Sequence, residues 1–417
     1  MTIPIMTMAR LDERWVCRGC GKCCRGNIVP LHADDLQRLR AQHWEKHPEF
    51  AHQPFIVRQG LFSLQYKLAQ RSDGTCVFLC KDGLCRIHQE FGFDEKPLVC
   101  RMYPLQVVPL EKTAVLTLRR SCPVAAAGEG AGLAEYLGEA RRYVRIRPLL
   151  AKPTSPPAVV KNQSRHWSDF LMITESLEEL IHDKQYPVSR RLVHGLWLCN
   201  LLEECRLKHL DAGELRDLVS VFAKAAPLKA EEMYLNPVHP GTAAGVLFRQ
   251  MIATYLRLHP LYDIHESWQE RCFTSMTAFA FTRGKGSVPS LHPAFPEAKF
   301  ADVEQRVLGP LDEQIQELFN DYFESNLSSK QYAIVSRPGW PLLNKFRALA
   351  LAFPVAFWML RYFSDNAPPS KETAISIITA IDRGQGYAPL TSTHHHHRIA
   401  HLQSLHALEQ LIIWYGR

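Results

Sequence analysis

The chain has 417 residues, of which 46% are hydrophobic and 22% charged, and its formal net charge is +7. This composition is typical of a folded globular protein and excludes a largely disordered chain. The charge is modest for this length and is not gathered into a basic block, so we expect no nucleic-acid partner. The first ten residues lack the apolar core of a secretory signal. The longest apolar stretch, 348–360, contains Pro354 and is shorter than the roughly 20 residues that cross a bilayer. We therefore expect a cytoplasmic protein with no membrane span.

Nine of the twelve cysteines lie in the first 122 residues. Four form one compact motif, C-x-x-C-x-x-C-C, and five more follow, in the order Cys17, Cys20, Cys23, Cys24, Cys76, Cys80, Cys85, Cys100 and Cys122. In a reducing compartment, clustered cysteines are better explained as metal ligands than as disulfides. Four thiolates close a tetrahedral zinc site or hold one iron–sulfur cluster. The region is therefore predicted to bind metal, and cysteine spacing alone does not separate zinc from iron–sulfur.

The paired cysteines at the end of the compact motif suggest two centres rather than one. Gly19 and Gly21 give the motif the backbone freedom that a tight metal-binding turn needs. In extended chain, successive side chains point to opposite sides, so Cys23 and Cys24 are expected to serve different centres. Two four-thiolate sites would then share the motif. The alternative, buried structural cysteines or a redox pair, accounts for a lone C-x-x-C better than for this number of clustered thiols.

The ordered motifs of this region resemble the YkgJ-type CxxCxxCC cysteine-cluster family. They are Cys17-Arg-Gly-Cys-Gly-Lys-Cys-Cys24, Gly74-Thr-Cys-Val-Phe-Leu79, Cys85-Arg-Ile-His88, Lys96-Pro-Leu-Val-Cys-Arg-Met-Tyr-Pro104 and Ser121-Cys-Pro123. The resemblance covers residues 15–125 and implies a zinc- or iron-chelating domain whose eight ligands are Cys17, Cys20, Cys23, Cys24, Cys76, Cys85, Cys100 and Cys122. Cys80 is a ninth cysteine outside the family pattern, and His88 has a plausible ligand spacing from Cys85. Both are additional candidates.

Hydrophobic periodicity predicts a mainly α fold in which a small cysteine-rich domain precedes an all-α domain. In residues 1–125 we expect a short helix at 31–40 and a β-hairpin formed by 105–110 and 114–118. Residues 126–165 are rich in Ala, Gly and Pro and resemble a linker. Residues 166–417 are predicted to be helical, with helices at 170–181, 189–207, from 211 onward, and at 242–258, 311–326, 342–363, 371–382 and 398–415.

The same family resemblance extends to the flagellin lysine-N-methylases, and it implies a methyltransferase that modifies a lysine of a protein substrate such as flagellin. S-adenosylmethionine would then be the methyl donor, although no motif marks a pocket for it. The catalytic and cofactor-binding residues are therefore left unassigned. Two other functions stay open: a non-enzymatic, zinc-stabilised protein-interaction module, and an iron–sulfur electron-transfer protein.

Two further features lie outside the cysteine-rich region. The run His394–His397 is predicted to be a solvated loop that leads into the last helix, the alternative being metal chelation by His397 and His401 at helical spacing. The three remaining cysteines are predicted to be core residues of helices: Cys199, Cys205 and Cys272.

Overall fold

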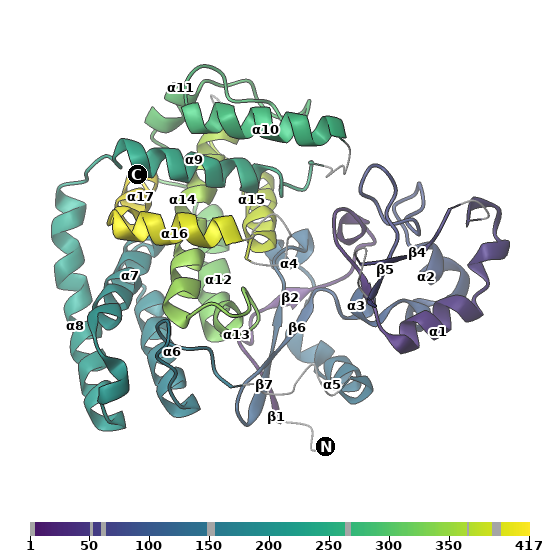
Figure 1. The fold of residues 1–417 in the computed structure, drawn as a ribbon, viewed down its shortest axis with the longest axis horizontal. Coiled ribbons are helices and arrows are strands. Elements are labelled where there is room, and N and C mark those ends of the chain that lie inside the picture. Colours follow the sequence, from purple (N-terminus) through teal and green to yellow (C-terminus); the bar gives the residue numbers. More distant parts are fainter. Residues whose placement is uncertain are drawn as a thin grey trace.

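The computed structural model describes residues 5–50, 53–59, 64–147, 155–262, 268–364, 367–385 and 393–417, and for 268–272 and 393 it describes the backbone only. Figure 1 shows three neighbouring parts. We call residues 16–102 the cysteine lobe, the strands and short helices of 5–15 and 103–146 the central sheet, and residues 167–417 the helical lobe. The mainly α fold with a small β-containing N-terminal region is confirmed.

The cysteine lobe is built on a small antiparallel sheet. Its strands run in the order β3 (Pro30–Leu31), β5 (Tyr66–Leu68) and β4 (Ile56–Arg58). The helices around it are α1 (Ala33–Ala41), α2 (Arg86–Phe91) and α3 (Leu98–Met102). Aromatic rings fill the interior: the ring of Phe78 lies 4.9 Å from that of Trp44 and 5.0 Å from that of Phe50, centroid to centroid. Because aromatic side chains bury a large area each, a small number of them is enough to form this core.

The central sheet has β1 (Ile5–Met8) parallel to β7 (Thr113–Leu118), which pairs antiparallel with β6 (Leu105–Pro109). The predicted hairpin is therefore confirmed. A second ladder joins β2 (Arg14–Trp15) to β8 (Ala131–Gly132). Two helices complete this part: α4 (Pro123–Ala127) and α5 (Leu137–Ile146).

Part of the segment expected to be a linker is folded onto the central sheet. In α5, Ala140, Tyr143 and Val144 are buried against the sheet, at the three- and four-residue spacing of one helix face. The Ala/Gly-rich stretch before α5 has the composition of a linker. The few apolar side chains of α5 are enough to pack the helix against the sheet. Residues 148–154, where the Pro-rich run begins, lie outside the described residues.

The helical lobe contains α6 (Trp167–His182), α7 (Val188–Glu204), α8 (Ala212–Leu235), α9 (Thr242–Leu256), α10 (Trp268–Arg283), α11 (Phe300–Gln305), α12 (Glu313–Ser328), α13 (Gln331–Ile334), α14 (Leu342–Phe363), α15 (Lys371–Arg383), α16 (Thr393–Ser404) and α17 (Ala407–Tyr415). The central helix is α14, which packs against α7, α9, α15 and α17 (Figure 1). It is long and apolar enough to cross a bilayer, but its most apolar window is 94% buried inside the protein. Burial in the core accounts for its composition.

Two expectations for the C-terminal part are wrong. The helix expected at 398–415 is divided into α16 and α17 at His406, whose φ of 50° interrupts helical geometry. The histidine run is the first turn of α16 rather than a solvated loop. His395 is buried, with its ring centroid 5.8 Å from that of Tyr255, and burial holds its pKa well below the ordinary value. His395 is therefore a neutral core residue.

The three cysteines expected in the helical core differ in burial. Cys199 is buried in the apolar core, as predicted, and Cys205 is half-buried, with its thiol donating to the Leu201 carbonyl oxygen at 3.2 Å. The side chain of Cys272 lies outside the described residues.

Buried charges join the central sheet to the helical lobe. The Arg120 guanidinium lies 3.1 Å from Glu13 and 2.8 Å from Asp321, measured N to O. The Ser325 hydroxyl donates to the same Glu13 carboxylate at 2.6 Å. Since a buried charge is tolerated only when it is paired, this network favours one relative placement of the sheet and α12.

Candidate metal centre

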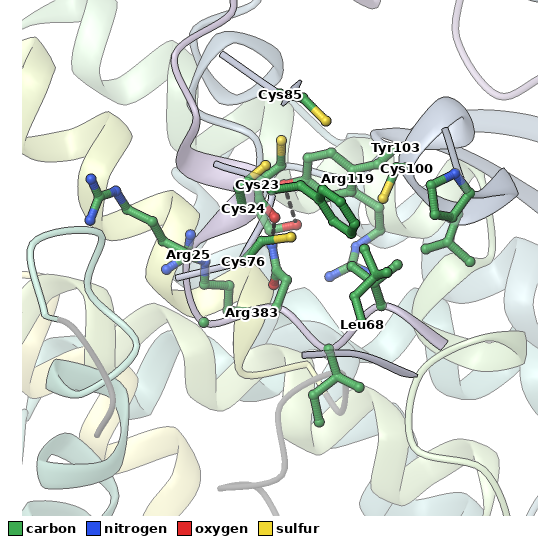
Figure 2. Close-up of a pocket in the computed structure, with 18 of the residues that line it drawn as sticks. Cys23, Cys24, Arg25, Leu68, Cys76, Cys85, Cys100, Tyr103, Arg119 and Arg383 are labelled. Carbon is green, nitrogen blue, oxygen red and sulfur yellow. Dashed lines mark hydrogen bonds between the residues drawn. The ribbon is translucent and has the colours of Figure 1, made fainter. Parts of the chain in front are cut away.

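A cavity of about 290 Å³ lies where the cysteine lobe, the central sheet and the helical lobe meet. Five of the nine N-terminal cysteines line it: Cys23, Cys24, Cys76, Cys85 and Cys100 (Figure 2). They come from four separate segments of the chain. The fold therefore gathers thiols that the sequence spreads over 78 positions, from 23 to 100.

Cys23 and Cys24 reach the cavity from a tight turn. Gly21, with a φ of 66°, precedes the 3₁₀ turn Lys22–Cys24. A Cβ atom at Gly21 would lie 2.8 Å from the carbonyl oxygen of Gly83, so glycine is required both by conformation and by space. The expectation that the paired cysteines face different centres assumed extended chain. In the 3₁₀ turn both side chains line the same cavity.

Backbone contacts hold Cys76 next to the turn. The Cys76 N–H donates to the Cys24 carbonyl oxygen at 2.8 Å. The guanidinium of Arg71 donates to the carbonyl oxygens of Cys76 at 3.1 Å, Val77 at 2.7 Å and Leu79 at 2.8 Å. This loop has little regular structure, so the arginine supplies the hydrogen bonds that a strand or helix would otherwise make.

Cys85 and Cys100 are positioned by short helices. Cys85 precedes α2, and its backbone pairs with that of Leu79 in an isolated β-bridge. Cys100 lies in α3, where the Leu98 N–H donates to the buried Asp35 carboxylate at 3.0 Å. The same carboxylate accepts the His32 N–H at 3.1 Å, which fixes the start of α1 against the start of α3. Each cysteine is thus held by its own local contacts.

Three of the cavity thiols, those of Cys23, Cys76 and Cys100, have raised pKa values, which favours their protonated form. Burial raises the pKa of Cys76 to about 12 and that of Cys100 well above the ordinary value, and the neighbouring thiols add to the shift at Cys100. The hydrogen-bonded Cys24 thiol, followed by desolvation, raises the pKa of Cys23. A bound cation would lower these pKa values, since metal coordination deprotonates thiols. Loading of the cavity should release protons.

The other four cysteines lie outside the cavity lining. Cys122 is buried beside Trp15 and within electrostatic range of Cys20. Cys17 lies within the same range of Tyr136, whose ring centroid is 5.0 Å from that of Trp15. Of the eight cysteines of the family pattern, five line the cavity, and Cys17, Cys20 and Cys122 lie outside its lining.

Cys80 and His88, the additional candidates, point elsewhere. The Cys80 thiol donates to the Gln89 side-chain oxygen at 3.3 Å. The exposed His88 ring lies 5.6 Å from that of Phe93, centroid to centroid. Neither residue lines the cavity.

The thiols of the cavity fit a thiolate-bound group, but their present arrangement does not fit a single metal ion. In the part of the chain that the structure describes, no three Cys, His, Asp or Glu side chains are grouped so that they could hold one metal ion. The five thiols instead surround an open volume. A single zinc ion needs four ligand atoms at about 2.0–2.3 Å from one point, so a mononuclear site would require these side chains to rotate inward.

No sequence pattern indicates the other walls of the cavity. Arg257, Leu258 and Tyr262 follow α9 or end it, and Arg383 is the last residue of α15. The central sheet adds Arg119. Single basic residues at helix ends are common on protein surfaces, and only the tertiary fold brings these together.

Comparisons with known proteins agree on the N-terminal region. Residues 16–123 match the family model described as "CxxCxxCC: Putative zinc- or iron-chelating domain". The chain is also 28% identical over 107 residues to an uncharacterized protein of Methanocaldococcus jannaschii, a match that covers 25% of this chain and 35% of that protein. No solved structure matches. The N-terminal quarter is therefore similar to zinc- or iron-chelating domains, which supports metal binding in general.

Proposed function

We propose that the cavity holds an iron–sulfur cluster bound by thiolates drawn from Cys23, Cys24, Cys76, Cys85 and Cys100. One observation favours a cluster over a single zinc ion. The five thiols line a cavity, and no three of them are grouped closely enough to bind one metal ion. A cluster presents its iron atoms at separate corners, so its thiolates approach from different directions and stay apart. A single zinc ion draws its ligands to one centre.

The placement of the cavity favours a function beyond stabilising the cysteine lobe. Structural metal sites are closed by their own ligands, whereas catalytic sites keep a position open to a second molecule. Here the helical lobe forms a wall of the cavity without contributing a cysteine to it. An enzyme, or an electron-transfer protein, fits this arrangement better than a zinc-stabilised interaction module.

The family resemblance supplies the specific activity in this proposal, which is methylation of a lysine on a partner protein such as flagellin. In that reaction the methyl group would pass from the sulfonium sulfur of S-adenosylmethionine to the lysine nitrogen, leaving a thioether, and the nitrogen would lose a proton. The support for this activity is the resemblance, and we assign no catalytic residue.

Three cysteine variants test the cluster directly. Cys76→Ser and Cys100→Ser each remove a thiol from the cavity, and Cys80→Ser removes one that is hydrogen-bonded outside it. Anaerobically purified Cys76→Ser and Cys100→Ser should lose most of the iron, sulfide and visible absorbance of the wild-type protein. Cys80→Ser should retain them. Equal metal content in all three variants would contradict the assignment.

The methylase part is tested separately, by calorimetric titration of S-adenosylmethionine into the anaerobic, metal-loaded protein. Saturable binding with one equivalent would support methyl transfer. Absence of binding to fully loaded protein would exclude it and leave the cluster assignment standing.

A further inference from the structure

The cavity is lined by basic side chains as well as by thiols. Five basic side chains line it: Arg25, Lys96, Arg119, Arg257 and Arg383. Among the described residues that line it, none is an aspartate or glutamate. A zinc ion or a [4Fe–4S] core held by four thiolates carries about two negative charges. Asp382, outside the lining, pairs with Arg119 at 3.1 Å, N to O, so this arginine already has a counter-charge.

Arg383 is the basic group best placed to meet a ligand. It reaches the cavity from the end of α15 and donates through one terminal nitrogen to the Leu258 carbonyl oxygen at 3.3 Å. Its Nε is buried and has no hydrogen-bond partner. Leaving a buried donor of a charged group unpaired is costly, and an incoming anion would remove that cost. Figure 2 shows Arg383 and Arg119 among the cysteines of the same cavity.

The remaining lining is apolar. It includes Ile28, Leu68, Phe78, Leu258 and Tyr262. An apolar cavity of about 150 Å³ is enough to bind benzene, so part of a space of about 290 Å³ can take a ring-sized group beside a thiolate-bound centre. A few charged donors within an apolar wall are typical of a site for a small organic molecule.

We propose that this cavity binds a small organic anion, a carboxylate or a phosphate with an apolar body, whose charged end meets Arg383 and the neighbouring basic side chains. The proposal rests on the proposed function in that the anion would lie beside the thiolate-bound centre. The helical lobe then has a defined role, since it supplies Arg257, Arg383 and part of the apolar wall. None of these is a candidate metal ligand.

The test is calorimetry on anaerobic full-length protein whose metal content has first been measured. Three probes of similar size separate the chemistries: phenyl phosphate, benzoate and the neutral benzamide. We expect one of the two anions to bind at one site per chain, and benzamide to bind at least tenfold more weakly. The better of the two anions shows whether the site prefers phosphate or carboxylate.

Variants locate the site. Arg383→Met should weaken the binding of the preferred anion about ten- to a hundredfold, the range expected for loss of a charge-assisted hydrogen bond, while metal content stays unchanged. Lys96→Gln changes a second basic side chain of the lining and should also weaken binding, which keeps the test valid if Arg383→Met misfolds. Arg141→Met, on the exposed side of α5, is the matched control and should bind as the wild-type protein does.

The outcomes distinguish this proposal from the metal assignment. Metal-loaded protein that binds neither anion, or binds benzamide equally well, overturns the anion site alone. Loss of metal from Arg383→Met with anion binding unchanged would show that the arginine only balances the thiolates, and it overturns the anion site as well. Anion binding by protein that contains no metal supports the anion site and contradicts the cluster.

Discussion

The cysteine lobe buries a small group of apolar side chains around Trp44 and Phe78, whereas the helical lobe has a continuous apolar core around α14. The strands of the cysteine lobe are two or three residues long, and much of its chain lies in turns held by side chains such as Arg71 and Asp35. Small domains with so little core usually depend on a metal or disulfides. The difference indicates that apolar burial stabilises the helical lobe, and we propose that inorganic ligation adds to the stability of the cysteine lobe.

The largest effect should come from removing the metal. Treatment of the anaerobic protein with a strong chelator should raise amide hydrogen exchange throughout the cysteine lobe by at least about a hundredfold, because ligand binding there contributes folding free energy. Exchange in α14 should change little, since its packing involves no ligand cysteine. Equal protection of both lobes before and after metal removal would show that the cysteine lobe folds without metal.

A cavity in the helical core should have the next largest effect. Leu349→Ala removes a fully buried side chain of α14 and should lower the free energy of unfolding by about 3 kcal/mol. Metal content should remain that of the wild-type protein. Val221→Ala, at a position that is 62% exposed on α8, is the control and should change stability by less than about 0.5 kcal/mol. Loss of metal from Leu349→Ala would mean that the two lobes are not separable in this way.

Two glycines in the cysteine lobe offer a closer comparison. Gly21→Ala adds a Cβ that would lie 2.8 Å from the Gly83 carbonyl oxygen, whereas Gly26→Ala adds one with no atom within 4 Å. Both positions have positive φ, 66° and 68°, so both variants lose about 1 kcal/mol from backbone strain. Gly21→Ala should lose about 1–2 kcal/mol more from the clash. Chemical unfolding monitored by metal release measures the difference, and equal midpoints for the two variants would argue against the described packing of the turn.

Acidification should weaken the helical lobe gradually. Burial lowers the pKa of His259 to about 3 and that of His194 to about 4. Below the ordinary histidine pKa of about 6.5 the unfolded chain takes up protons that the folded chain does not. The free energy of unfolding should therefore fall as pH falls from 6.5 toward 4, by up to about 1.4 kcal/mol per pH unit for each histidine.

A double variant isolates this pH dependence. His194→Gln with His259→Gln removes both titrating groups, so the slope of stability against pH between 6.5 and 4 should become smaller even if the variant is less stable at neutral pH. An unchanged slope would assign the acid sensitivity to other groups.

Local sequence patterns predict many of the helices and strands, whereas the features that depend on long-range packing have no such pattern. Apolar periodicity placed α14 at Leu342–Phe363, and the β-prone runs around Thr113 predicted the hairpin. The sequence predicts extended chain at Cys23 and Cys24, whereas the structure has a turn there, because the local geometry depends on Gly21 and on its contact with Gly83, 62 positions later. The cationic wall formed by Arg257 and Arg383 has no local signature. It exists only because α9 and α15 end beside the cysteine lobe.

Iron and acid-labile sulfide analysis of the wild-type protein, purified without oxygen, tests the central claim most directly. We expect iron and sulfide in equal amounts, about four of each for every cluster, with zinc well below one equivalent. Colourless protein with stoichiometric zinc and no sulfide would contradict the cluster assignment. Protein that contains neither metal would contradict thiolate ligation at the cavity altogether.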